Sequence, residues 1–153
     1  MRLAAALLLF LASHPVAAAL PACAATVDGL RALLQDPAFP LTWEETTMAD
    51  ARPLLVTLDE RDGALHLSIH KTGEGRWAAG HARVCGDASG LEARYDAASL
   101  HVGPAAGWLL RQGLQAGAAV TLRRLPAGEL RIGTVGWSSR FAPATPQIGL
   151  RAR

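Results

Sequence analysis

The sequence predicts a single α+β domain in which a curved antiparallel sheet, built as a β-meander, packs against one or two helices. Three observations support this fold class. Apolar and polar residues alternate through much of residues 41–102, as they do in half-buried strands. Turn-forming residues separate the alternating runs, which favours antiparallel pairing of neighbouring strands. Only two short segments have the spacing of an amphipathic helix.

The chain begins with the layout of a secretory signal peptide. Arg2 precedes an apolar run over residues 3–12, and small residues suited to cleavage follow it. The run is about ten residues long, whereas a membrane-spanning helix needs about twenty, and no later segment is apolar enough to span a bilayer. We therefore expect an exported, periplasmic or secreted bacterial protein without a transmembrane span. Its expected parts are a signal peptide over 1–22, cut between residues 19 and 24, one domain over 26–142 and a loose tail over 143–153.

The position of cleavage decides the fate of Cys23, one of only two cysteines in the chain. If Cys23 is retained, a disulfide with Cys85 is expected, because an exported protein meets an oxidising compartment. Cleavage after Ala24 would remove Cys23. The stretch LPAC at 20–23 resembles a bacterial lipoprotein box, so a lipid anchor on Cys23 is a third alternative.

The first helix and the following strands can be assigned in order. Thr26 is placed to cap a short helix that ends before Asp36-Pro37. Alternation then predicts strands, and the Asp62-Gly63 dipeptide is the strongest hairpin signal among them. The strands expected from the alternation are 41–48, 53–61, 64–71, 76–85 and, more weakly, 91–95 and 99–102.

The second helix is expected over residues 103–117. Pro104 suits a first helical position and Gly117 suits a C-terminal cap. A last hairpin follows, with AVTLRRL and ELRIGTVGW as its strands and PAG as its turn.

Two tight turns determine which side chains between residues 54 and 85 face inward. A two-residue turn at 62–63 places Asp59 opposite His66, and a four-residue loop at 72–75 places His66 opposite His81 and His70 opposite Trp77. The face that this register makes apolar is expected to be the core. Its members are Val56, Leu58, Leu65, Leu67, Ile69, Ala78, Gly80, Ala82 and Val84. Because Ala78, Gly80 and Ala82 are small, something bulky should approach them, with the 103–117 helix as the expected neighbour and an apolar ligand as the alternative.

The opposite, polar face carries the candidate functional residues. Asp59, His66 and His81 lie in a row on three adjacent strands, and directly opposed side chains are close enough to share a zinc ion. An ordinary solvent-facing ion pair is the alternative interpretation. His70, Trp77 and His81, together with Trp108, are candidates for binding a partner or ligand, since exposed aromatic residues suit contact surfaces.

Composition and motifs exclude several functions. The formal net charge of +2 lacks the strongly basic footprint of nucleic-acid binding, and no nucleophile elbow, HExxH, P-loop or dinucleotide-binding motif occurs. We therefore expect a non-enzymatic binding module of the bacterial envelope, without a cofactor, that holds a protein partner or an apolar small molecule. The alternatives are a metal-binding protein that uses Asp59, His66 and His81, and a lipoprotein anchored through Cys23.

Overall fold

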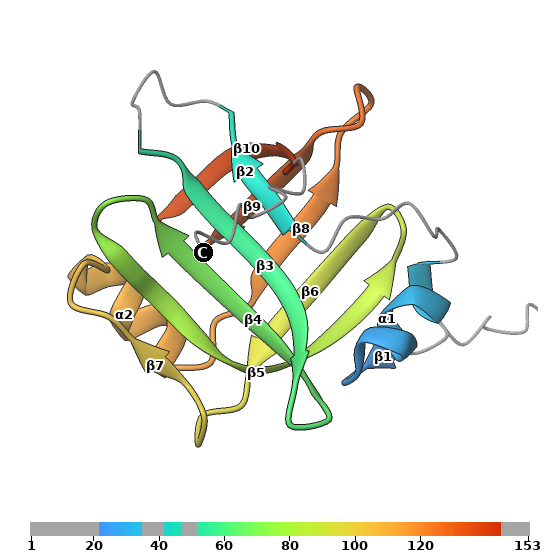
Figure 1. Ribbon diagram of the computed structural model, residues 1–153, viewed down its shortest axis with the longest axis horizontal. Coiled ribbons are helices and arrows are strands. Elements are labelled where there is room, and N and C mark those ends of the chain that lie inside the picture. Colours follow the sequence, from blue (N-terminus) through green and yellow to red (C-terminus); the bar gives the residue numbers. More distant parts are fainter. Residues whose placement is uncertain (1–21, 35–41, 47–51, 145–153) are drawn as a thin grey trace, which may run out of the picture.

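The strands of the chain form one antiparallel sheet that closes on itself into a barrel (Figure 1). The computed structural model describes residues 22–34, 42–46 and 52–144; almost all of the expected signal peptide and residues 145–153 of the expected tail lie outside these ranges. The described strands are β1 (Cys23–Ala24), β2 (Thr42–Glu45), β3 (Leu54–Arg61), β4 (Ala64–Lys71), β5 (Gly75–Asp87), β6 (Gly90–Tyr95), β7 (His101–Val102), β8 (Val120–Arg124), β9 (Leu130–Thr134) and β10 (Trp137–Pro143). The two described helices are α1 (Val27–Leu34) and α2 (Trp108–Gln115).

The barrel contains eight strands in the order β2-β3-β4-β5-β6-β8-β9-β10, and β10 returns to pair with β2. Each strand therefore pairs with the barrel strands before and after it in the chain, and all pairs are antiparallel. The short strands β1 and β7 pair with β5 outside this ring. Closure removes the two free edges that an open sheet would expose.

The expectation of a curved sheet packed against helices is therefore wrong. The last predicted strand ended at Trp137 and the predicted tail began at Pro143, with no element between them. The sequence GWSSRFAP instead forms the turn residue Gly136 and the closing strand β10. Gly136 has a φ of 72°, a left-handed conformation that glycine adopts without strain. The seam is completed where Phe141 pairs with Glu45 of β2 and where the Thr46 amide donates to the Arg140 carbonyl at 2.8 Å.

The interior of the barrel is built from the predicted apolar face. All nine residues assigned to that face between Val56 and Val84 are buried. The other strands add further fully or almost fully buried side chains, namely Trp43, Leu91, Ala93, Val120, Leu122, Leu130, Ile132 and Phe141. An eight-stranded barrel has a bore that side chains of this size can fill.

The predicted register of β3 and β4 is confirmed over the whole hairpin. Asp62 and Gly63 form its turn with positive φ values of 53° and 75°, and Asp59 pairs with His66. The next hairpin also pairs His66 with His81, as predicted. Its last two pairs differ, because His70 pairs with Arg76 and not with Trp77, and Lys71 pairs with Gly75.

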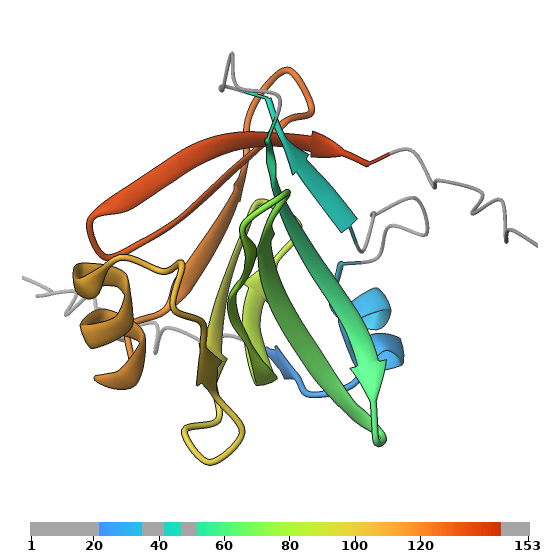
Figure 2. The same ribbon diagram turned by 60° about the vertical axis from the view of Figure 1, so that its left-hand side comes forward.

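The two helices lie at opposite ends of the barrel (Figures 1 and 2). Thr26 caps α1 as predicted, since its Oγ1 accepts the Gly29 amide at 3.0 Å. Leu30 and Leu34 of α1 belong to the core, and the Val27 amide donates to Glu60 at 3.2 Å. We call the end of the barrel that carries α1 the α1 end. The opposite end, where β4 leads into β5 and β9 leads into β10, we call the α2 end.

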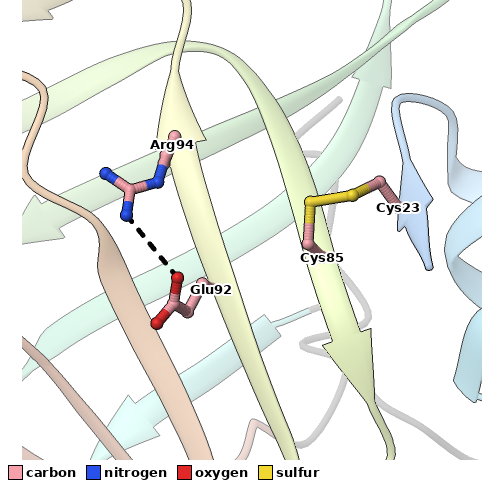
Figure 3. Close-up of a disulfide and its surroundings, with 4 residues drawn as sticks. All are labelled: Cys23, Cys85, Glu92 and Arg94. Atoms are coloured by element: carbon pink, nitrogen blue, oxygen red, sulfur yellow. Dashed lines mark ion pairs between the residues drawn. A yellow bond between two sulfur atoms is a disulfide. The ribbon is translucent and has the colours of Figure 1, made fainter. Parts of the chain in front are cut away.

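The disulfide between Cys23 and Cys85 is confirmed (Figure 3). Cys85 alternates with the buried Val84 and so lies on the outer wall, where β1 pairs with β5. The bond ties the segment that enters α1 to the barrel. On the neighbouring strand β6, Arg94 and Glu92 form an exposed ion pair at 3.6 Å.

Helix α2 is shorter than predicted and lies elsewhere than expected. It begins at Trp108 because Gly107 has an extended conformation. It buries Leu110 and Leu114 at its end of the barrel. The neighbour of the small residue Gly80 is the backbone before β7, since a Cβ at Gly80 would lie 3.1 Å from the Leu100 Cα.

Candidate functional site

A bulge in β5 changes the direction of Trp77. Ile69 pairs with Ala78 and His70 pairs with Arg76, so Trp77 is an extra residue without a partner on β4. An extra residue of this kind bends the strand and re-aims its side chain. Trp77 was predicted to stand exposed on the polar face beside His70; it is instead half-buried and packs against the core.

Trp77 meets Trp137 across the α2 end of the barrel. Their ring centroids are 6.2 Å apart, with the planes at 70°. β5 and β10 are separated by three strands in either direction around the ring, so they stand on opposite walls. A contact between them therefore spans the bore. Trp137 in turn lies edge-on to the fully buried Phe141, with 6.0 Å between centroids. We call Trp77, Trp137 and Phe141 the aromatic bridge.

Two buried polar groups on or beside the aromatic bridge have no hydrogen-bond partner among the described residues. They are Trp77 Nε1 and Thr134 Oγ1, and Thr134 pairs directly with Trp137 across the β9–β10 turn. Leaving a buried donor or acceptor unsatisfied costs about 1–3 kcal/mol. Such groups are expected to acquire a partner, either water or a ligand.

Further polar residues point inward on the barrel strands. Tyr95 shares the inner face of β6 with Leu91 and Ala93, and its hydroxyl is buried without a partner among the described residues. Burial raises the pKa of the Tyr95 phenol above its usual value. Glu45 and Lys71 are also buried, at the ends of β2 and β4.

Glu45 and Lys71 lie on either side of the same strand, β3. Leu54 pairs with Lys71 in the β3–β4 register and donates its amide to Glu45 Oε2 at 3.2 Å. Both charged residues therefore lie near the α2 end. By contrast, Leu58 and Leu67, which lie further from the α2 end on β3 and β4, are fully buried and purely aliphatic.

Helix α2 and the β9–β10 turn expose an apolar patch beside the aromatic bridge. Trp108, Leu109 and Val135 are 73%, 51% and 43% exposed. The patch is continuous with the bridge, because the Leu109 side chain lies against Gly136 and Trp137 follows Gly136 directly. Figure 2 shows the turn beside the helix. We call Trp108, Leu109 and Val135 the outer patch.

The predicted row of Asp59, His66 and His81 is present on the outer wall. His66 Nδ1 lies 3.3 Å from Asp59 Oδ1, and its ring meets the His81 ring edge-on with 5.9 Å between centroids. Burial lowers the pKa of His66 below its usual 6.5. The charge of Arg61 and the neighbouring His81 lower it further, while Asp59 opposes the shift.

The lowered pKa of His66 predicts a loss of stability in mild acid. As the pH falls below 6.5, the unfolded chain binds a proton at His66 before the folded chain does, so the free energy of unfolding decreases. His66→Gln should reduce this dependence between pH 7 and pH 5, as measured by urea unfolding. Equal pH dependence in wild type and His66→Gln would contradict the assignment.

The remaining predicted site residues do not form one site. His70 is exposed near the end of β4, His81 contacts His66 and Trp108 projects from α2. Within the described ranges, no three His, Cys, Asp or Glu side chains are arranged to hold a metal ion. The zinc site at Asp59, His66 and His81 stays a prediction.

Sequence reasoning missed Trp137 and Thr134. The available signal was Gly136, which marks a turn; Val135 and Gly136 form that turn, and Thr134 and Trp137 flank it. No helix in the described part of the chain is long and apolar enough to cross a membrane.

No family model, curated protein or solved structure matches the chain.

Proposed function

We propose that the protein is an exported, non-enzymatic binding module of the bacterial envelope that holds an apolar small molecule at the α2 end of its barrel, against Trp77 and Trp137. The observation that carries this proposal is the contact of these two tryptophans across the bore. Both rings are half-buried, so they keep accessible surface at the point where the barrel interior begins. Closed eight-stranded barrels are of a size that can hold one small ligand.

Three further observations favour this function. The outer patch gives an apolar molecule a continuous surface leading to Trp137. The unpartnered Trp77 Nε1 and Thr134 Oγ1 can supply the few polar contacts that orient a ligand in an apolar site. The β5 bulge that turns Trp77 inward is of a kind often found beside functional sites.

The disulfide supports export, because disulfides persist mainly in oxidising compartments. It also occupies Cys23 Sγ, the atom to which a lipid anchor would be attached. Of the alternatives from the sequence, a soluble module without a lipid on Cys23 is therefore favoured.

The proposal can be tested with 1-anilinonaphthalene-8-sulfonate, whose fluorescence rises in an apolar site. We expect the folded protein to bind this probe, and Trp137→Leu to weaken binding about tenfold, because it removes one aromatic contact of about 1.5 kcal/mol. Trp108→Ala removes an equally large but exposed ring from the outer patch, and we expect it to change the dissociation constant less than twofold.

Two outcomes would overturn the proposal. If Trp108→Ala abolishes binding and Trp137→Leu does not, the probe occupies the outer patch and not the barrel. If the natively folded protein binds no probe at micromolar concentration, the α2 end is not a small-molecule site. Near-ultraviolet circular dichroism of each variant shows whether the native packing is retained.

A further inference from the structure

The interior below the aromatic bridge restricts the shape of a ligand. Beyond Phe141 the inner face carries fully buried aliphatic side chains such as Leu58 and Leu67. In a bore this narrow, these side chains take the space that a long acyl chain would need. A ligand of the proposed function is therefore held near the α2 end, where a compact molecule fits better than an extended one.

The geometry of the aromatic bridge favours a flat ring. Trp77 meets Trp137 at 70° and Trp137 meets Phe141 at 81°, so each pair is arranged edge to face. Aromatic molecules add to such a series by stacking or by a further edge contact. An aliphatic molecule gains only burial at the same surface.

The polar groups of the site define what the ring must carry. The indole Nε1–H of Trp77 can only donate a hydrogen bond, and it is buried without a partner among the described residues. The Thr134 hydroxyl, beside Trp137, is in the same state and can also donate. A ligand acceptor would satisfy these groups, whereas a purely hydrocarbon ligand would leave them unsatisfied.

We infer that the ligand class is a compact, flat aromatic molecule bearing a carbonyl or similar acceptor, which receives the hydrogen bond of Trp77 Nε1–H. This inference rests on the proposed function, since it specifies the ligand of the same site. The rings of Trp77 and Trp137 would favour aromatic ligands over aliphatic ones. The Trp77 N–H, together with the Thr134 hydroxyl, would favour ligands that carry a hydrogen-bond acceptor.

The experiment compares three probes by isothermal titration calorimetry. 2-Acetylnaphthalene and 2-ethylnaphthalene have nearly the same size and differ by one carbonyl oxygen, and decanoate represents an aliphatic chain. We expect both naphthalenes to bind more tightly than decanoate, and the ketone to bind about 3- to 10-fold more tightly than the ethyl compound, as one net hydrogen bond gives.

Variants then locate the donor. Trp77→Phe keeps a ring and removes the N–H, so it should abolish the preference for the ketone even if both affinities fall. Thr134→Val keeps the side-chain shape and removes the hydroxyl, and it should reduce the preference. Ser138→Ala removes an exposed hydroxyl beside Trp137 on the outer side of β10, so it is the matched control for Thr134→Val and should leave the preference unchanged.

The remaining outcomes distinguish a failure of the inferred ligand class from a failure of the proposed binding function. Equal affinity for the two naphthalenes in the wild type, or a preference that survives Trp77→Phe, overturns the acceptor inference while the binding function stands. Tighter binding of decanoate than of either naphthalene overturns the aromatic class but not the function. If none of the three probes binds, the proposed function itself is wrong, and the inference falls with it.

Discussion

Replacing Cys23 and Cys85 together by serine is expected to lower the free energy of unfolding by about 4 kcal/mol. The disulfide joins residues that are 62 positions apart in the chain, so its loss frees a long loop in the unfolded state. It also releases a two-residue strand, β1, that leads directly into α1. Since α1 contributes Leu30 and Leu34 to the core, its detachment would expose the α1 end of the barrel.

Urea unfolding of the double variant, followed by circular dichroism, measures this loss. Wild-type protein treated with a reductant is the matched control, because it breaks the same bond without changing the side chains, and it should show the same loss. A difference below about 1 kcal/mol in both samples would contradict the expectation. It would mean that β1 and α1 are held on the barrel without the disulfide.

Replacing Phe141 by alanine is expected to destabilise the fold by about 3–5 kcal/mol. Phe141 is fully buried and pairs with Leu130 on one side and with Glu45 on the other, so it lies at the seam that closes the barrel. It also supports Trp137 through an edge-on ring contact. The variant should therefore lose probe binding as well as stability.

Ser138→Ala provides the control for this substitution, because Ser138 lies on the same strand with its side chain exposed. Its effect should stay within about 0.5 kcal/mol. Denaturant unfolding of the two variants at equal temperature gives the comparison. A loss of less than about 1 kcal/mol for Phe141→Ala would contradict a packed seam between β2 and β10.

The sequence predicted the local structure of residues 54–85 well, because local rules determine it. Asp62-Gly63 fixes one turn, and alternation of apolar residues fixes the inward face, so the pairing of Asp59, His66 and His81 is as predicted. The position of Trp77 was predicted wrongly because β5 contains one extra residue relative to β4. A three-residue turn followed by a bulge uses the same number of residues as a four-residue loop, and the alternation cannot tell them apart.

Barrel closure could not be predicted in the same way, since it depends on a pairing between strands that are distant in the chain. β2 has only four residues, and most of β10 follows Trp137, where the last predicted strand ended, in a segment to which no element was assigned. Alternation shows that each segment can form a strand and does not show that the last one pairs with the first. Trp137 was missed as a site residue for this reason.

The contact between Trp77 and Trp137, which lie on opposite walls of the closed barrel and meet across its α2 end, supports both the fold and the proposed site. Nuclear Overhauser contacts between the side-chain protons of these two residues test it most directly. We predict contacts between the two indole rings, together with backbone contacts between β2 and β10 around Glu45 and Phe141. Contacts from Trp77 to His70 without any to Trp137 would contradict the account.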